Sequence, residues 1–297
     1  MTKIRFISLL LIGLSVGVNA QKISPYYNCG QVEETIQSAK AKVVETLNAK
    51  GYAVTGEYDV ANDVAMHVLC FSSEELQQTC LKVKDKGILA SNLRIGFQTV
   101  GNKTELTIVN PKYIFLGYLR AGYDANKKVL DKIDKEVKSA MQGFTNQLTA
   151  FGGSLEESEL KKYHYMAMMP YFDDPVELGE FISYEDALAT IDKNLELKKG
   201  NTTRVYKLSF ATSKMAVYGV GLLDKEMGEG HYLPIIGTKH FAAMPYEIVV
   251  MDNVAYMLHG RFRFAMFWPE LKMSTFTKIM STPGNVEGML KGLTKNK

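Results

Sequence analysis

Two histidines and a glutamate lie close together in the segment GEGHYLPIIGTKH, residues 228–240. The imidazoles of His231 and His240 and the carboxylate of Glu229 are groups that bind zinc, which takes three or four such ligands. YLPIIG, between the histidines, is a short apolar run typical of a strand about 20 Å long. The two rings are therefore predicted at opposite ends of one strand, and a metal site would need a further ligand such as His259. The alternative places these histidines at the surface, at the ends of the strand.

Copper is the second metal that the sequence suggests. Thioether and imidazole ligands suit copper, and several methionines lie near histidines: Met166, Met168, Met169, Met227, Met244, Met251 and Met257. Methionines are more simply explained as flexible core side chains, and YMAMM, residues 165–169, is predicted to be a buried strand. The candidate metal ligands are thus His231, His240 and His259, for either zinc or copper.

The chain has three cysteines, Cys29, Cys70 and Cys80. Cys70 ends a predicted strand and Cys80 lies on the following predicted helix, so these two are a possible disulfide if the geometry allows. The alternative is three small buried apolar side chains. The absence of a C-x-x-C pair argues against a thioredoxin-like motif or a four-cysteine zinc site.

Enzyme signatures are missing from the sequence. It contains no HExxH, no phosphate-binding loop and no complete G-x-G-x-x-G. RFRFAMF, residues 261–267, alternates like a strand, with Arg261 and Arg263 on one face, which could bind an anion or form a solvated surface. A catalytic triad assembled from distant residues is left open, so catalytic residues are unknown and no cofactor is predicted.

The first twenty residues have the pattern of a secretory signal peptide. A basic start is followed by an apolar run and a small-x-small end, with cleavage expected after Ala20. The run is short for a bilayer span, so no membrane span is predicted after its removal. The expected location is periplasmic or extracellular. Lys3 and Arg5 are lost with this segment, which leaves a net charge near zero and gives no reason to expect a nucleic-acid partner.

The elements that would position these side chains occur in the same order in both halves. In the first half a helical stripe at 32, 36, 39, 43 and 47 precedes Gly51, strands at 52–60 and 66–71, a helix after Ser72, and a hairpin about Gly101-Asn102. In the second half a stripe at 184, 188, 191 and 195 lies 152 residues later. It precedes Gly200, strands at 205–211 and 232–237, and a hairpin about Asp252-Asn253. The material at 215–230 is interpreted as an insertion. The repeated order predicts an internal duplication.

This organisation predicts four parts: a signal peptide at 1–20, a first α+β domain at 22–150, a linker at 151–162 and a second α+β domain at 163–297. The linker is expected from its two glycines and charged run. Each domain is expected to have two layers, an antiparallel-rich sheet packed with helices.

The order of elements resembles the domain-of-unknown-function 302 family. The segments that carry the resemblance are VEETIQSAKAKVVETLNAKGYAV, VLCF, LRIGFQTVGNKTELTIVNPKYI, YLPIIGTK, MPYEIVVMDN and FWPEL. The resemblance implies tandem copies of a compact two-layer domain that tends to dimerise, joined here as a pseudo-dimer within one chain. It implies no catalytic residues.

The leading hypothesis is a secreted or periplasmic, non-enzymatic protein that binds a small ligand or a protein partner between its two domains, where ligand sites are common. One alternative is a zinc- or copper-binding periplasmic protein. A second alternative is a hydrolase with an unrecognised site.

Overall fold

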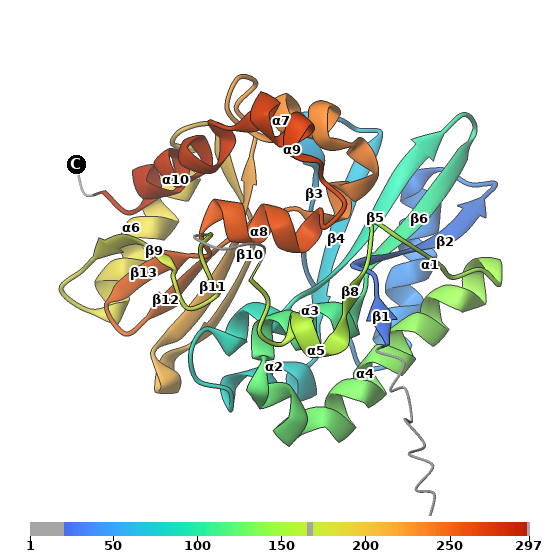
Figure 1. Ribbon diagram of the computed structural model, residues 1–297, viewed down its shortest axis with the longest axis horizontal. Helices are drawn as coiled ribbons and strands as arrows, with labels where there is room; N and C mark the ends of the chain where they lie inside the picture. Colours follow the sequence, from blue (N-terminus) through green and yellow to red (C-terminus); the bar gives the residue numbers. More distant parts are fainter. Residues whose placement is uncertain (1–20, 165–168, 296–297) are drawn as a thin grey trace, which may run out of the picture.

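The computed structural model describes residues 21–164 and 169–295 (Figure 1). The expected signal peptide with its cleavage site at Ala20 lies outside the described residues. So do Met166 and Met168, and with them most of the strand predicted at 165–169.

The first half of the chain forms a six-stranded antiparallel sheet with the order β3-β4-β5-β6-β2-β7. Its strands are β2 (Tyr26–Val32), β3 (Ala53–Asp59), β4 (Met66–Ser72), β5 (Leu93–Val100), β6 (Lys103–Val109) and β7 (Thr149–Phe151). The predicted hairpin is confirmed, because β5 and β6 pair antiparallel up to Val100 and Lys103. Gly101 at its turn has φ +64°, a conformation that glycine adopts at little cost. All residues of β4 are buried, so both faces of this sheet are covered.

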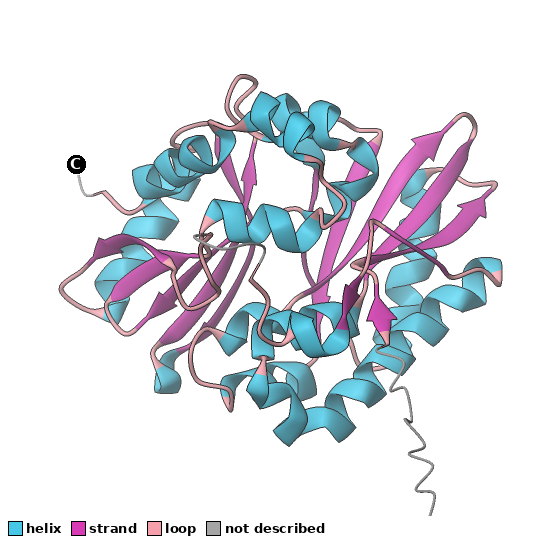
Figure 2. Cartoon of the chain, viewed as in Figure 1, coloured by secondary structure: helices cyan, strands magenta, loops and turns pink. Residues whose placement is uncertain are grey.

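The second half forms a five-stranded antiparallel sheet with the order β10-β11-β12-β13-β9. Its strands are β9 (Val176–Glu180), β10 (Thr202–Phe210), β11 (Met215–Leu222), β12 (Tyr246–Met251) and β13 (Val254–Met257). The predicted hairpin about Asp252-Asn253 is confirmed as the β12–β13 turn. Corresponding strands thus take corresponding places in the strand orders of the two sheets. The two sheets lie on opposite sides of the molecule in Figure 2.

Helices also follow the same order in both halves. The first half has α1 (Ile36–Ala49), α2 (Glu74–Leu81), the 3₁₀ segments η1 (Val60–Asn62) and η2 (Gly87–Ser91), α3 (Pro111–Leu119) and α4 (Ala121–Thr145). The second half has α6 (Tyr184–Glu196), η3 (Ala211–Ser213), α7 (Glu229–Ile236), η4 (Thr238–Ala243), α8 (Gly260–Phe267), α9 (Met273–Phe276), η5 (Thr277–Ile279) and α10 (Thr282–Leu293). The molecule is therefore α+β, with two similar units that each pack helices on an antiparallel sheet.

The two helical stripes match with a different offset from the one expected. The side chains of Thr35 and Ser183 cap α1 and α6, each by accepting from the backbone N–H three residues later. Buried residues on α1 then lie 148 residues before those on α6: Ala39, Val43 and Leu47 against Ala187, Ile191 and Leu195. The 152-residue offset was wrong by one helical turn, because Val32 belongs to strand β2 and not to the helix.

Three expected elements in the second half are corrected. Residues 232–236 belong to helix α7, which ends before Gly237, and the alternating run 261–267 belongs to helix α8, whereas both segments were predicted as strands. Residues 215–222, interpreted as part of an insertion, are β11, the counterpart of β4. Helix α8 is buried on nearly all sides, so it lacks the apolar and polar faces by which a surface helix is found from its sequence. Helix α7 has one buried face, but Glu229 lies on that face and Pro234 and Ile235 lie on the more exposed side.

Each sheet has one face covered by helices of its own half and the other by a segment of the opposite half. In the first sheet α1 and α4 contact one face, while η4 from the second half contacts β4, β5 and β6. A Cβ on Gly96 of β5 would lie 2.7 Å from the Phe241 ring in η4. In the second sheet α6 covers one face, and η2 from the first half contacts β11 and β12. This reciprocal packing gives the pseudo-dimer arrangement, with α8 between the two sheets in Figure 1.

The edge strands β3 and β10 lie against each other at the centre of the molecule. A Cβ on Gly56 of β3 would come within 1.7 Å of the Val205 carbonyl oxygen in β10. Each strand has a bulge here, between Val54 and Gly56 and between Arg204 and Tyr206. Glycine is therefore required by this close approach of two backbones.

The segment expected to be a linker is folded. Residues 155–156 form β8, which pairs with β1 (Lys22–Ile23), and α5 (Glu157–Leu160) follows. Phe151 already belongs to β7 of the first sheet. The connection between the halves therefore packs on the first half. Among the described residues, no helix combines the length and the apolar character that crossing a membrane requires.

Candidate functional site

The three histidines proposed as metal ligands lie in different elements. His231 lies on α7, His240 lies in η4, and His259 caps α8 by accepting from the Arg261 N–H at 3.2 Å. The expectation that His231 and His240 end one strand is wrong, because the residues between them form the rest of α7, the turn at Gly237 and the start of η4. Within residues 21–164 and 169–295, no group of three or more His, Cys, Asp or Glu side chains is arranged to hold a metal ion.

The three cysteines are separate buried thiols. Cys29 lies on β2, and Cys70 and Cys80, the possible disulfide, lie unbridged on β4 and α2. Burial raises the pKa of both Cys29 and Cys70 to about 12, so neither thiol forms the reactive thiolate near neutral pH. They behave as small core side chains.

A polar cleft of about 610 Å³ lies between the halves. One wall comes from the edge of the first sheet, and the other from η4 and the loop after α8. The volume is within the range of small-molecule sites, which is about 300–1,000 Å³. The lining residues are Asn28, Gly30, Gln31, Glu105, Gln147, Thr149, Phe151, Gly152, Lys239, His240 and Glu270.

The second half contributes a histidine–carboxylate pair to this cleft. His240 Nε2 lies 3.2 Å from Glu270 Oε1. The imidazole is surrounded by aromatic rings, with centroids of Tyr26, Trp268 and Phe151 at 5.2, 5.6 and 5.9 Å. Burial lowers the pKa of His240 and the Glu270 carboxylate partly offsets this, so the ring is neutral near pH 7. A neutral imidazole both donates and accepts a hydrogen bond.

The first half contributes amide side chains aligned along a bulge in β2. The register of β2 shifts between Asn28 and Gln31, and such bulges redirect side chains at functional sites. Gly30, with φ +86°, lets its N–H donate to Asn28 Oδ1 at 2.6 Å. Gln31 Nε2 donates to Glu105 Oε2 at 3.3 Å, across the wall. The bulge thus presents polar groups to the cleft.

Tyrosine hydroxyls fix the position of α8 behind the cleft. Those of Tyr163, Tyr113 and Tyr26 donate to the carbonyls of Ala265, Met266 and Phe267 at 3.2, 2.7 and 3.0 Å. These carbonyls lie in the last turn of α8, where a helix lacks partners for its C=O groups. Helix α8, which precedes the loop that carries Glu270, is thereby tied to the first half through Tyr26 and Tyr113.

A buried ionic cluster closes the interface beneath η4. Arg94 of β5 and Arg263 of α8 both pair with the carboxylate of Glu247 on β12, and both guanidinium groups donate to the Ala243 carbonyl, at 2.8 and 2.7 Å. The three charged side chains are at most 4% exposed. Arg263, predicted on a solvated strand face, is therefore a buried residue. Because no solvent reaches this cluster, it joins the halves and cannot meet a ligand directly.

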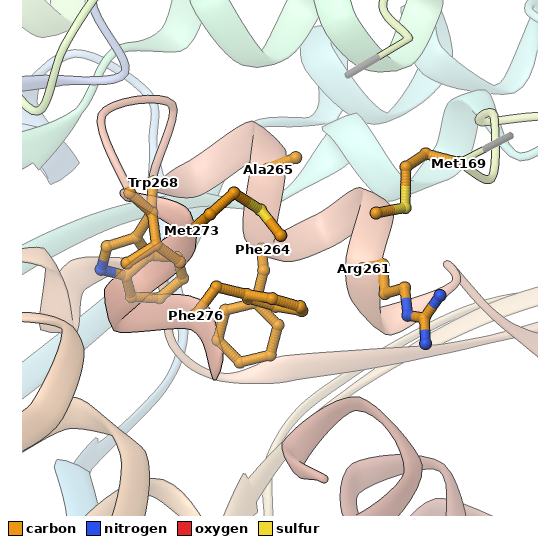
Figure 3. A pocket seen from close by; sticks show the side chains of 8 residues that line it. Met169, Arg261, Phe264, Ala265, Trp268, Met273 and Phe276 are labelled. Carbon is orange, nitrogen blue, oxygen red and sulfur yellow. The ribbon is translucent and has the colours of Figure 1, made fainter. Parts of the chain in front are cut away.

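A second, apolar pocket lies along α8 and α9. In Figure 3 the rings of Phe264, Trp268 and Phe276 gather beside Met273, and Arg261 lies to one side. Its free volume is about 30 Å³, room for little more than a water molecule. The polar cleft is therefore the better candidate site.

The sequence indicated one cleft residue, His240, and missed the others. They come from five segments that are far apart in sequence and meet only through the sheet order and the packing of η4. A bulge in β2 leaves no signal stronger than the glycine in NCGQ.

No family model and no curated protein matches the sequence. Among solved structures, the chain is similar to an uncharacterized conserved protein DUF302 from Bacillus stearothermophilus, with 14% identity and a TM-score of 0.35. The match covers 40% of this chain and 98% of that chain. A DUF302 protein is thus a structural neighbour of this molecule.

Proposed function

We propose that the protein binds a small polar ligand, without transforming it, in the cleft between its halves. The observation that supports this most is the cleft itself, whose two walls come from different halves and are tied together by buried hydrogen bonds. A preformed site loses little conformational entropy when a ligand binds.

We also propose that the chain is exported and acts outside the cytoplasm after cleavage at Ala20, as the pattern of its first twenty residues suggests. The two halves are proposed to be tandem copies of a DUF302-like unit. The shared strand order and the constant 148-residue offset between α1 and α6 support a duplication.

Native mass spectrometry of exported residues 21–297 tests the binding function. Thr149 is an exposed residue of the edge strand β7 that lines the cleft, so Thr149→Trp should fill the cleft without disturbing the core. Ser209→Trp, at an exposed strand position outside the cleft, is the matched control. We expect an additional organic mass on the wild type and the control, and its loss from Thr149→Trp.

Two other results would redirect the proposal. A bound metal in place of an organic molecule would favour the zinc or copper alternative, and His240→Ala should then remove it. If the wild type, Thr149→Trp and Ser209→Trp all carry no additional mass, tight binding of a small ligand is contradicted.

A further inference from the structure

We propose that the cleft takes an uncharged, polyhydroxylated ligand of about the size of a mono- or disaccharide. This inference rests on the proposed binding function and adds the chemical class of the ligand.

The charges of the cleft argue against an anion. Its acidic and basic side chains are Glu105, Glu270 and Lys239, and burial lowers the pKa of His240, which disfavours a charge on the ring. Two carboxylates and one ammonium give no excess of positive charge for a phosphate or a carboxylate ligand. Both carboxylates already have polar partners, His240 beside Glu270 and Gln31 beside Glu105, so the one excess negative charge does not require a cationic ligand, and a neutral ligand fits.

The remaining polar groups suit hydroxyls. The amides of Asn28, Gln31 and Gln147 and the hydroxyl of Thr149 each both donate and accept hydrogen bonds. A sugar hydroxyl does the same. Carboxylates accept only, and Glu105 is already oriented by Gln31, which leaves lone pairs free for a ligand hydroxyl.

One aromatic ring supplies an apolar wall. Phe151 lines the cleft from β7, and its ring stacks on Tyr26 with centroids 5.2 Å apart at an interplanar angle of 23°. This support from behind fixes the ring, and the C–H face of a sugar ring can pack on such a rigid aromatic surface at little entropic cost.

Two glycines keep the amide side chains and the aromatic ring accessible on the same wall of the cleft. Gly30 and Gly152, with φ of +86° and +87°, lie on the lining beside the amides and the aromatic ring. A Cβ on Gly30 would lie 2.7 Å from Gln147 Oε1, and one on Gly152 would lie 2.7 Å from Tyr26 Cδ2. Glycine at both positions leaves the amide and the ring pair unobstructed.

Saturation-transfer difference NMR on residues 21–297 tests the ligand class, because it detects weak binding. The neutral probes are maltose, cellobiose, N,N′-diacetylchitobiose and glucitol, and the charged probes are citrate and spermidine, all at millimolar concentration. We expect signal from at least one neutral probe with the wild type and with Ser209→Trp, and none with Thr149→Trp. Phe151→Ala should lower the affinity for that probe about tenfold. Phe210→Ala, on a strand of the second sheet, should leave this affinity unchanged.

The outcomes separate this inference from the proposed function. Binding of citrate or spermidine alone, blocked by Thr149→Trp, would overturn the ligand class and leave the binding function intact. An absence of signal from every neutral probe would also overturn the ligand class, whereas the binding function is judged by the mass spectrometry above. Neutral-probe binding that survives Thr149→Trp would show that the cleft is not the site.

Discussion

The hydroxyl of Tyr58 in the first half donates a 2.8 Å hydrogen bond to Glu229 Oε1 in the second half. The same carboxylate accepts from the backbone N–H groups of Ala61 and Leu222, at 3.0 and 3.1 Å. Glu229 is fully buried, and burial raises its pKa to about 7 despite these three donors. A group at the interface of the halves therefore ionises near neutral pH.

Glu229→Gln should make the stability less dependent on pH. Because the folded protein holds this proton more tightly than the unfolded chain, the stability that Glu229 contributes is fully present below its unfolded pKa of about 4.5. It is lost as the pH rises through about 7, by up to about 3 kcal/mol. Urea denaturation at pH 5 and pH 8.5 measures the change for each form. Glutamine loses the hydrogen bond from the Ala61 N–H, which lowers the unfolding free energy by the same amount at both pH values. An identical pH dependence in the wild type and in Glu229→Gln would contradict the raised pKa of Glu229.

The buried ionic cluster predicts an order among its variants. Glu247→Gln leaves two guanidinium groups buried without a counter-charge and should cost about 3–5 kcal/mol of unfolding free energy. Arg94→Met should cost less, about 1–3 kcal/mol, because Arg263 still pairs with Glu247 and still donates to Ala243. Denaturant midpoints at pH 7 give both values, and the reverse order would show that Arg94 is the main partner of the carboxylate.

A pair of glycine variants tests the contact between β3 and β10. Gly56→Ala places a methyl group 1.7 Å from the Val205 carbonyl oxygen, so the edge strands must separate, at a cost of at least about 2 kcal/mol. Gly143→Ala, within α4 and with no atom in reach of the new methyl, should instead stabilise by about 0.5–1 kcal/mol. Thermal unfolding compares the two, and equal effects would mean that the backbones are not in close contact.

Thiol titration tests the state of the cysteines. With Cys29, Cys70 and Cys80 buried as thiols, Ellman's reagent should not react with the folded protein and should label three thiols once it is denatured without reductant. A single reactive thiol after denaturation would reveal a disulfide, with Cys70 and Cys80 as the first pair to examine.

Local signals in the sequence predicted most of the first half. The turn at Gly101 and the buried stripe of α1 each depend on neighbouring residues, and both are present in the structure. The errors at 232–237 and 261–267 have different causes. Helix α8 is buried on nearly all sides by tertiary packing, which one sequence does not reveal and which leaves no helical period. Helix α7 has a buried face with helical spacing, but Glu229 on that face and the apolar Pro234 and Ile235 outside it hide the period.

The candidate site was largely beyond prediction because tertiary packing brings its residues together. His240 was noticed as a residue type, but its partner Glu270 was not, because the pair forms only when the loop after α8 returns to η4. Arg263 was interpreted as solvated because its alternating surroundings suggested a strand. Its burial follows from its place beneath η4, between the two sheets.

The exchange of η2 and η4 between the halves has a consequence for how the chain acquires its structure. The first sheet has all of its strands once residue 151 has been made, yet one of its faces gains its cover only from residues 238–243. Until residues 238–243 are available, the first half therefore exposes apolar surface to water. We expect the two units to form in a single cooperative event, and a chain ending at residue 160 to aggregate in place of folding.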